Sequence, residues 1–340
     1  MPVYNGERYL ADSLRALLAQ DYPHFELIIS DNASTDGTEK ICREFKKTDS
    51  RIRYIPHLQN RGATWNFASV VHQASGKYFM WAAHDDSRAP SFISKCLSKL
   101  ESHPRAMLCC TEINFVDADG LPDQEWTKKK FENLDTDGMS PVERVHELIA
   151  RCGWFAIYGL MRLEDTRKLS LGLSVQGWDV IFLMELMMKG NFIKVREPLF
   201  SYRIAQKKKS TADYQEEMNS EGQTAAATTT PFTDLAVNLI RTVYGSQLSD
   251  ANKSAIFADF ISTITFLNDY WRQQITSELV ATDLRMENSR FAALLNLVLS
   301  RGVPCESFKK NPLLEIFFAN ASGQSHLLQL AQSVALSTGR

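Results

Sequence analysis

The sequence predicts an α/β protein in which helices flank a mostly parallel sheet and a helical region follows. Strand-like and helix-like segments alternate over roughly the first 120 residues, and strands separated by helices of about 10 to 15 residues favour parallel pairing. A polar stretch low in bulky apolar residues then interrupts the pattern, as a linker or flexible loop does. We therefore expect an α/β domain over 1–205, a polar linker over 206–231 and a helical region over 232–340.

The elements of the first half follow from residue spacing. Leucines recur at helical spacing over 7–20 and predict a helix that ends before Pro23. Asp36, followed three residues later by Glu39, is typical of a capping box and predicts a helix over 37–47. The other expected elements are strands over 25–31, 51–57 and 77–83 and a helix over 63–74.

The second half has weaker patterns. Apolar runs predict strands over 106–117, 155–162 and 192–204, and Pro198 is expected to interrupt the last of these because proline cannot donate to a ladder. Helical periodicity predicts five helices, over 140–153, 179–190, 234–245, 255–275 and 289–302.

Composition argues against several classes of protein. The 340 residues are 44% hydrophobic and 23% charged, which suits a globular chain with a buried core. A net charge of -2 gives no basic field for a nucleic-acid backbone, so no nucleic-acid partner is expected. The six cysteines contain no C-x-x-C, and no apolar run approaches the roughly 20 residues that span a bilayer. We expect a cytoplasmic protein with reduced thiols, and contact with a membrane surface stays open.

Two adjacent carboxylates, Asp85 and Asp86, follow the apolar run 78–83 directly. Like charges side by side repel, so a positive partner is expected there. Ligands of parallel sheets lie beyond the carboxyl ends of the strands, and Asp31 also follows an expected strand. The alternative is that the pair caps the next helix, which starts near Ala89.

Several ordered motifs, "PVYNGERYL", "SDNASTDGT", "NRGATWNF" and "HDD", together resemble those of family 2 glycosyltransferases. The resemblance covers roughly residues 1–205 and weakens through "GWDVIFLMELMMKGNFIKVREPLFSYR". It implies the GT-A nucleotide-diphospho-sugar transferase fold for this region. Family members carry an apolar strand just before the "PVYN" text, whereas this chain begins at Met1. We therefore expect the usual first strand to be absent here, either because the true start lies upstream or because the chain has lost this element.

The resemblance implies an inverting enzyme that moves a sugar from a nucleotide diphosphate to an acceptor hydroxyl. The HDD loop is similar to the family's D-x-D element, which makes Asp86 the expected metal ligand and places Asp85 against the ribose or sugar. A divalent cation would neutralise the diphosphate leaving group, and oxygen ligands suit Mg²⁺ or Mn²⁺. The expected cofactor is therefore Mg²⁺ or Mn²⁺, with a nucleotide-diphospho-sugar as donor.

By the same resemblance, the nucleoside lies against Pro2, Tyr4 and Glu7 in the first loop and against Asp31. These residue types fit, because an aromatic ring can stack on a base and a carboxylate can accept a hydrogen bond from a base N–H. Arg61 lies in a segment similar to the family's N-x-G element and is expected near the base or a phosphate. A solvated arginine is the equal alternative.

The catalytic base implied by the resemblance is Asp179, near the start of an expected helix. An inverting transfer needs such a base to take the proton of the attacking hydroxyl. The alternative is that Asp179 only complements the dipole at the N-terminus of its helix. Arg203 resembles a family arginine near a loop that closes over the diphosphate.

Two other functions stay open. A catalytically inactive GT-A-like domain that binds nucleotide or protein would follow from a missing first strand. A dehydrogenase is disfavoured because no G-x-G-x-x-G follows a strand. The expected partners are the nucleotide sugar and a glycan or lipid-linked acceptor of bacterial surface polysaccharide or glycoconjugate synthesis. For the C-terminal helices, packing on the α/β domain is expected, with a homodimer or contact with the inner face of a membrane as alternatives.

Overall fold

In the computed structural model, the described residues are 1–129, 133–151, 153–173, 175–204, 231–263, 271 and 273–274. The chain divides into two compact units, Met1–Ala227 and Thr228–Arg340. The predicted boundaries at residues 205 and 231 stay predictions, because 205–230 lies outside the described residues.

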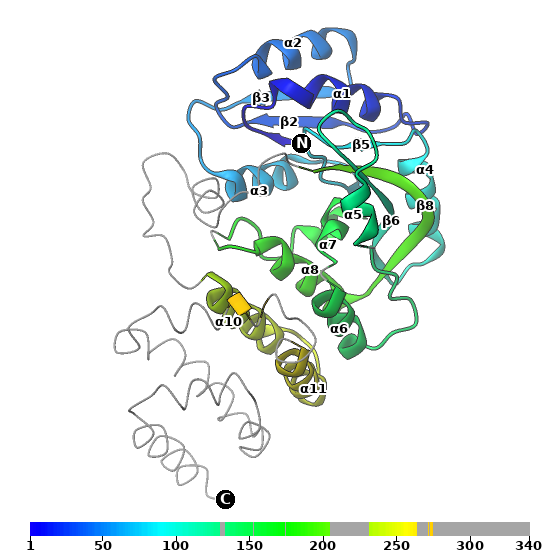
Figure 1. Cartoon of the computed structure of the whole chain (residues 1–340), viewed down its shortest axis with the longest axis vertical. Helices are drawn as coiled ribbons and strands as arrows, with labels where there is room; N and C mark the ends of the chain where they lie inside the picture. The colour runs from blue at the N-terminus through cyan, green and yellow to red at the C-terminus, as the bar shows by residue number, and fades with distance from the viewer. Residues whose placement is uncertain are drawn as a thin grey trace, which may run out of the picture. The chain divides into compact units, whose positions relative to one another are not determined.

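A parallel three-stranded sheet opens the first unit (Figure 1). Its strands pair in the order β1-β2-β3, with Val3 beside Asp31 and Asp31 beside Pro56. This register brings the carboxyl ends of the three strands to one edge. Figure 1 shows α1 and α2 on one face of this sheet and α3 on the other. The elements are β1 (Pro2–Val3), α1 (Glu7–Leu18), β2 (Leu27–Asp31), α2 (Thr38–Thr48), β3 (Ile52–Pro56) and α3 (Ala63–Gln73).

The first strand of this sheet lies within the "PVYN" text itself. Pro2 and Val3 form a short parallel strand beside β2, and the Ser30 amide donates a hydrogen bond to the Met1 carbonyl oxygen at 2.9 Å. Met1 and Val3 are buried in the core together with Leu10 of α1. Only two residues, both within the "PVYN" text, therefore pair beside β2 at this position.

A five-stranded mixed sheet follows, in the order β4-β7-β6-β8-β5. Its long ladder is parallel and joins ten residue pairs of β6 and β8, whereas each antiparallel ladder joins only two pairs. The expectation of a mostly parallel sheet between helices is thus confirmed. The strands are β4 (Tyr78–Phe79), β5 (Ser87–Arg88), β6 (Ala106–Val116), β7 (Leu160–Arg162) and β8 (Asn191–Arg203).

Three predicted strands differ from the observed ones. The strand expected over 77–83 is limited to β4, because Trp81 packs among aromatic rings instead of continuing a ladder. The strand expected over 155–162 begins as a short 3-10 helix, η1 (Trp154–Tyr158). Pro198 does not interrupt β8. It pairs with Glu112 of β6, and the register between the two strands shifts on either side of this pair.

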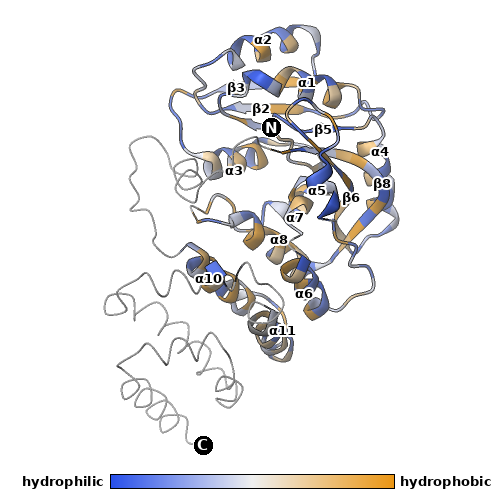
Figure 2. Ribbon diagram, viewed as in Figure 1, coloured by the Kyte–Doolittle hydropathy of each residue, from blue (hydrophilic) through white to orange (hydrophobic). Residues whose placement is uncertain are grey.

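The helices of this part of the first unit are α4 (Phe92–Ser102), α5 (Gln124–Lys128), α6 (Pro141–Arg151), α7 (Leu163–Thr166) and α8 (Trp178–Lys189). Figure 2 shows α8 as apolar over most of its length, and most of its residues are buried. A helix that is apolar on all sides is a core helix. It therefore holds Asp179, in its first turn, in a fixed position.

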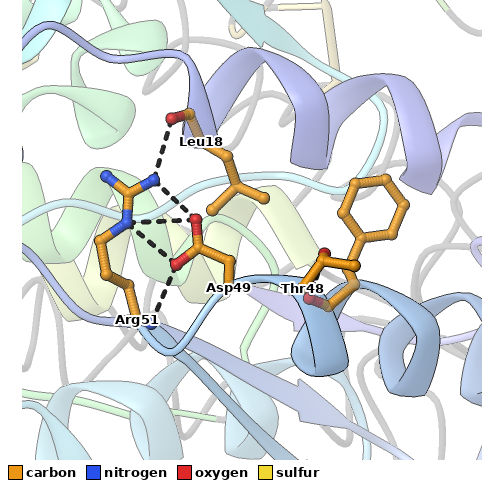
Figure 3. A network of polar contacts seen from close by, with 5 residues as sticks. Leu18, Thr48, Asp49 and Arg51 are labelled. Atoms are coloured by element: carbon orange, nitrogen blue, oxygen red, sulfur yellow. Dashed lines mark hydrogen bonds and ion pairs between the residues drawn. The ribbon is translucent and has the colours of Figure 1, made fainter.

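A polar network closes the α2–β3 connection, as Figure 3 shows. The Arg51 guanidinium donates to both carboxylate oxygens of Asp49 and, at 3.0 Å, to the carbonyl oxygen of Leu18 at the end of α1. The hydrogen bonds from Arg51 lower the pKa of Asp49. Here both charges have partners, as expected for a structural pair.

The described part of the second unit consists of α10 (Pro231–Gly245), α11 (Asp250–Ser262) and residues that follow them. Phe232 and Phe260 contact the ring of Trp271 edge to face. The helix expected over 289–302 lies outside the described residues. Within the described residues, none of the helices combines the length and apolar character needed to cross a membrane.

Candidate active site

The two loops after β1 and β2 are tied to each other by their own side chains. Asp36 accepts hydrogen bonds from the backbone amides of Glu7 and Thr38, each at 3.0 Å, and so caps the starts of α1 and α2 together. In return, the Glu7 carboxylate accepts a hydrogen bond from the Gly37 amide at 3.0 Å. Glu7, a predicted nucleoside ligand, thus holds the loop edge in place.

The other predicted nucleoside residues lie along the same edge. Asp31 is buried, and its carboxylate accepts hydrogen bonds from the Tyr54 hydroxyl at 2.6 Å and from the Ser34 amide at 2.9 Å. Pro2 is buried in β1, whereas Tyr4 just beyond it is 40% exposed. The exposed Tyr4 ring at the end of β1 is available to stack on a flat ligand. Asp31 is not available in the same way, because its carboxylate is buried and binds Tyr54 and Ser34.

Asn32 fixes the loop that carries Arg61. Its side-chain oxygen accepts a hydrogen bond from the Arg61 amide at 3.0 Å, and its side-chain nitrogen donates to Asn60 at 2.7 Å. The Arg61 guanidinium lies over the ring of Trp65, 4.1 Å from its centroid. Arg61 is therefore an exposed cation held over an aromatic ring at the same edge.

The carboxylate loop, residues 84–86, meets this edge directly. A Cβ atom at Gly6 would lie 2.8 Å from the ring of His84, so only glycine permits this close approach. The Ser13 hydroxyl of α1 donates to the Ala83 carbonyl oxygen at 3.0 Å. The structure thus brings the predicted nucleoside loop and the predicted metal loop together.

Asp86 carries an unsatisfied negative group. It is 2% exposed, and one carboxylate oxygen, Oδ1, accepts a hydrogen bond from the Arg203 amide at 2.9 Å. The other oxygen, Oδ2, has no hydrogen-bond partner among the described residues. Burial, with a further contribution from Asp85, raises the pKa of Asp86 to about 8. A buried carboxylate in this state is costly unless a cation pairs with it.

This geometry fits a divalent cation. The described residues contain no group of three His, Cys, Asp or Glu side chains that would bind a metal alone. A hard cation with phosphate ligands needs only one or two protein carboxylates, and Asp86 Oδ2 with the adjacent Asp85 supplies that number. The pair does not cap α4, because the residue before that helix is Ser91.

Arg88 is a site residue that the sequence analysis missed. Its guanidinium is buried and donates to the carbonyl oxygens of Trp81 at 2.8 Å and Tyr158 at 3.2 Å. Nε and Nη1 have no hydrogen-bond partner among the described residues. Burial lowers the pKa of Arg88 to about 10, and the nearby Asp86 opposes this shift. The sequence did contain a signal for Arg88. It lies two residues after Asp86 in an extended segment, and such residues point to the same side.

Arg203 anchors the carboxylate loop. Its side chain donates to the carbonyl oxygens of Asp85, Asp117 and Ala118, each at 2.9 Å. Its guanidinium also lies 4.5 Å from the centroid of the Tyr9 ring. Arg203 thus joins two loops at the end of β8, and only its Nη2 is left without a hydrogen-bond partner among the described residues. Contact with a diphosphate stays a prediction.

Asp179 lies in the first turn of α8, after Gly177 with a φ of 73°. The neighbouring Trp178 packs against Phe67 and Trp81, at centroid distances of 5.4 and 5.9 Å. Burial raises the pKa of Asp179, although hydrogen bonds from backbone amides of its own turn oppose the rise. A raised pKa makes this carboxylate a stronger base than an exposed aspartate.

Tyr158, whose carbonyl oxygen accepts the hydrogen bond from Arg88, was also missed by the sequence analysis. Burial raises the pKa of its hydroxyl, with further contributions from Tyr202, Asp86, Asp85 and Asp179. The hydroxyl therefore interacts electrostatically with the carboxylate loop and with Asp179. The sequence could not reveal this role of Tyr158, because the segment over 155–162 was expected to be a strand and instead begins as the 3-10 helix η1.

Comparison with known proteins finds a family match in the first third of the chain. The model of glycosyl transferase family 2 matches residues 1–114. The match is to a family 2 domain over these residues. This domain contains β1 to β5 and most of β6, and with them the loops of Asp31, Asp85 and Asp86.

Curated relatives share this domain. The "Putative teichuronic acid biosynthesis glycosyltransferase TuaG" of Bacillus subtilis is 31% identical over 121 residues, 36% of this chain and 48% of the relative. The "Putative glycosyltransferase EpsE" of the same organism is 33% identical over 122 residues, 36% of this chain and 44% of the relative. The chain spans about half the length of the curated relatives it matches.

Solved structures show the same fold over more of the chain. TarS 1-349 of S. aureus in complex with UDP has a TM-score of 0.62 at 15% identity, covering 94% of this chain and 85% of TarS 1-349. The mannosyltransferase PcManGT of Pyrobaculum calidifontis, in complex with GDP-Man and Mn2+, has a TM-score of 0.50 at 14% identity, with 94% and 83% covered. The family 2 domain therefore has the GT-A fold predicted from its motifs.

Proposed function

We propose that this chain is a metal-dependent, inverting glycosyltransferase that moves a sugar from a nucleotide-diphosphate donor to an acceptor hydroxyl. The observation that carries the proposal is the buried Asp86, whose Oδ2 has no partner among the described residues. It lies where the loops of the nucleoside edge meet the carboxylate loop. TarS bound to UDP and PcManGT bound to GDP-Man and Mn2+ support this choice of ligands.

In this proposal Asp86, with Asp85 beside it, holds Mg²⁺ or Mn²⁺. When bound, the cation supplies positive charge to the departing diphosphate. Tyr4 and Arg61 border the nucleoside, and Asp31 and Glu7 keep its loops in shape. Arg203 fixes the carboxylate loop through the Asp85 carbonyl oxygen, so the carboxylates stay in position when the donor binds.

Asp179 is the proposed base. Its carboxylate takes the proton of the acceptor hydroxyl while the acceptor oxygen bonds to the anomeric carbon. The bond from that carbon to the diphosphate oxygen breaks, and the nucleoside diphosphate leaves with the electron pair. Burial favours this role because it raises the pKa of Asp179. Attack opposite the leaving group inverts the anomeric centre.

The acceptor is proposed to be a glycan or lipid-linked sugar of bacterial surface polysaccharide synthesis, with the cytoplasm as the expected compartment. The name of TuaG, which assigns it to teichuronic acid biosynthesis, supports this choice. The alternative is a catalytically inactive GT-A-like domain that binds nucleotide or protein. Such a domain would bind a donor without transferring its sugar.

Hydrolysis and transfer assays with UDP-, GDP- and TDP-sugars, each with and without Mn²⁺, test the proposal. Metal-dependent release of a nucleoside diphosphate from one donor is expected. Asp86→Ala should lose metal-linked donor binding, whereas Asp179→Ala should keep binding and lose transfer. If both variants retain transfer, the site assignment is wrong. If no donor is used in any condition, the enzyme assignment is wrong.

A further inference from the structure

A cavity of about 350 Å³ lies at the far end of the long β6–β8 ladder. The start of β6, the start of β8, the end of α8 and the beginning of α6 enclose it. Its volume falls within the range of small-molecule sites, about 300 to 1,000 Å³. The polar side chains that line it are Arg105, Arg144, Arg162, Asp165, Lys189 and Asn191.

The charge around this cavity is strongly unbalanced. Four of its lining residues are cationic and only Asp165 is acidic. None of the four cations forms an ion pair with a residue in the described part of the chain. Elsewhere Arg51 and Arg43 each have a carboxylate partner. Uncompensated positive charge that faces a cavity is a feature of anion sites.

Two of the cations are held rigidly. Arg144 is 7% exposed and donates to the carbonyl oxygens of Met187 at 2.8 Å and Met139 at 2.9 Å. Arg162 donates to the carbonyl oxygens of Ala106 at 3.1 Å and Leu100 at 3.0 Å. These bonds explain why arginine stands at both positions, yet carbonyl oxygens do not neutralise the two full charges. The positive field is therefore preformed.

The other two cations lie at the rim. Arg105 and Lys189 are exposed, and their side chains form no hydrogen bond or ion pair with any described residue. Lys189 also ends α8, where the helix dipole adds negative character and makes a cation favourable. Both side chains are thus free to reach an anion that enters the cavity.

The cavity is distinct from the candidate active site. Asn191, which lines it, pairs with Ala106 at one end of the ladder, whereas Arg203 pairs with Val116 at the other. Twelve residues of strand separate these ends, a contour of at most about 40 Å. Neither the nucleoside edge nor the carboxylate loop contributes a lining residue.

We propose that this cavity binds a small phosphate-bearing molecule. A phosphate group carries close to two negative charges and three acceptor oxygens, which matches several convergent cations better than a single carboxylate does. Guanidinium groups suit phosphate because their N–H groups form a planar fork. The volume accommodates a phosphorylated small molecule and not a folded partner.

Isothermal titration calorimetry of the full chain tests this site, in low-salt buffer without divalent cations. The probes are inorganic phosphate and glucose 1-phosphate. Saturable binding of at least one probe is expected. The double variant Arg105→Ala, Lys189→Ala removes only exposed side chains and is expected to weaken binding at least tenfold, with an unchanged circular dichroism spectrum. If glucose 1-phosphate binds more tightly than inorganic phosphate, the site recognises an organic phosphate. If the two bind equally, the site recognises the phosphate group alone.

The matched control is Lys46→Ala, Lys47→Ala on α2, which removes the same charge from an exposed helix end. It is expected to leave binding unchanged. No saturable binding of either probe would overturn the proposal. The proposal would also be overturned if the Arg105 and Lys189 variant bound the probe as tightly as the wild type. An equal loss of affinity in the control would overturn it too, because it would mean that only general charge attracts the anion.

Discussion

The β6–β8 ladder ends in two regions of opposite charge. Near Arg203, the buried Asp86 keeps one carboxylate oxygen without a partner in the described residues. Near Asn191, four cations surround a cavity with a single acidic side chain. In the network of Asp49 and Arg51, by contrast, both charges are paired. The comparison indicates that charged groups without an ion-pair partner lie where a ligand binds. A free carboxylate favours a cation, and free cations favour an anion.

The largest effect is expected for Asp179→Asn, which keeps the shape of the carboxylate and removes its basicity. Transfer should fall by about 100- to 10,000-fold. Stabilisation of the protein by nucleotide and Mn²⁺ should stay at the wild-type level, which thermal unfolding measures. Asp250→Asn, in the first turn of α11, is the control and should leave transfer unchanged. Equal losses in both variants would contradict the role of Asp179.

Tyr158→Phe removes a hydroxyl whose pKa is raised in part by Asp85, Asp86 and Asp179. The value of kcat should fall about tenfold, the equivalent of one hydrogen bond made in the transition state, while KM for the donor changes little. Tyr78→Phe is the matched control, because its buried hydroxyl has no hydrogen-bond partner in the described residues. A loss of kcat in the control, or none in Tyr158→Phe, would remove Tyr158 from the site.

Arg203→Met tests how the carboxylate end is held. It removes three hydrogen bonds to carbonyl oxygens, and the free energy of unfolding should fall by about 1 to 3 kcal/mol. Chemical denaturation measures this change. Arg144→Met should cause a similar loss at the cationic end, since it also removes bonds to two carbonyl oxygens. An unchanged stability in either variant would mean that the arginine is not an anchor.

The smallest effect is expected for Asp49→Asn. The hydrogen bonds from Arg51 lower the pKa of Asp49 in the folded state, so the pair stabilises the fold above the usual pKa of 3.8 and loses this effect as the pH falls below it. The pair is partly exposed, so the loss at pH 7 should be below about 1 kcal/mol. The melting temperatures of variant and wild type should converge as the pH falls through the lowered pKa of folded Asp49. A difference that persists there would contradict this linkage.

The sequence predicted the features that depend on local pattern. The helices around 7–20 and 37–47, the α/β fold and the loops of Asp31 and Asp86 follow from spacing and from family motifs. Arg88 was missed because one of its two carbonyl partners, that of Tyr158, is 70 residues away. The interruption expected at Pro198 was wrong, because whether a proline fits a ladder depends on the facing strand.

The cationic cavity could not be predicted either. Its four cations come from the α4–β6 connection, α6, β7 and α8, and only the packing of these elements brings them together. The carboxylate pair, by contrast, stands in one short run of sequence. Contiguous sites can therefore be predicted from residues alone, whereas dispersed ones require the fold.

The central claim is that Asp86 binds a divalent cation together with a nucleoside diphosphate. Thermal unfolding of the full chain at pH 7.5, with UDP, GDP or TDP and increasing Mn²⁺, tests it most directly. With one nucleotide, Mn²⁺ should stabilise the wild type by about 2.7 kcal/mol once ligand reaches 100 times its Kd, and Asp86→Asn should abolish this metal-dependent gain. An equal gain in the variant, or no gain with any of the three nucleotides, would contradict the claim.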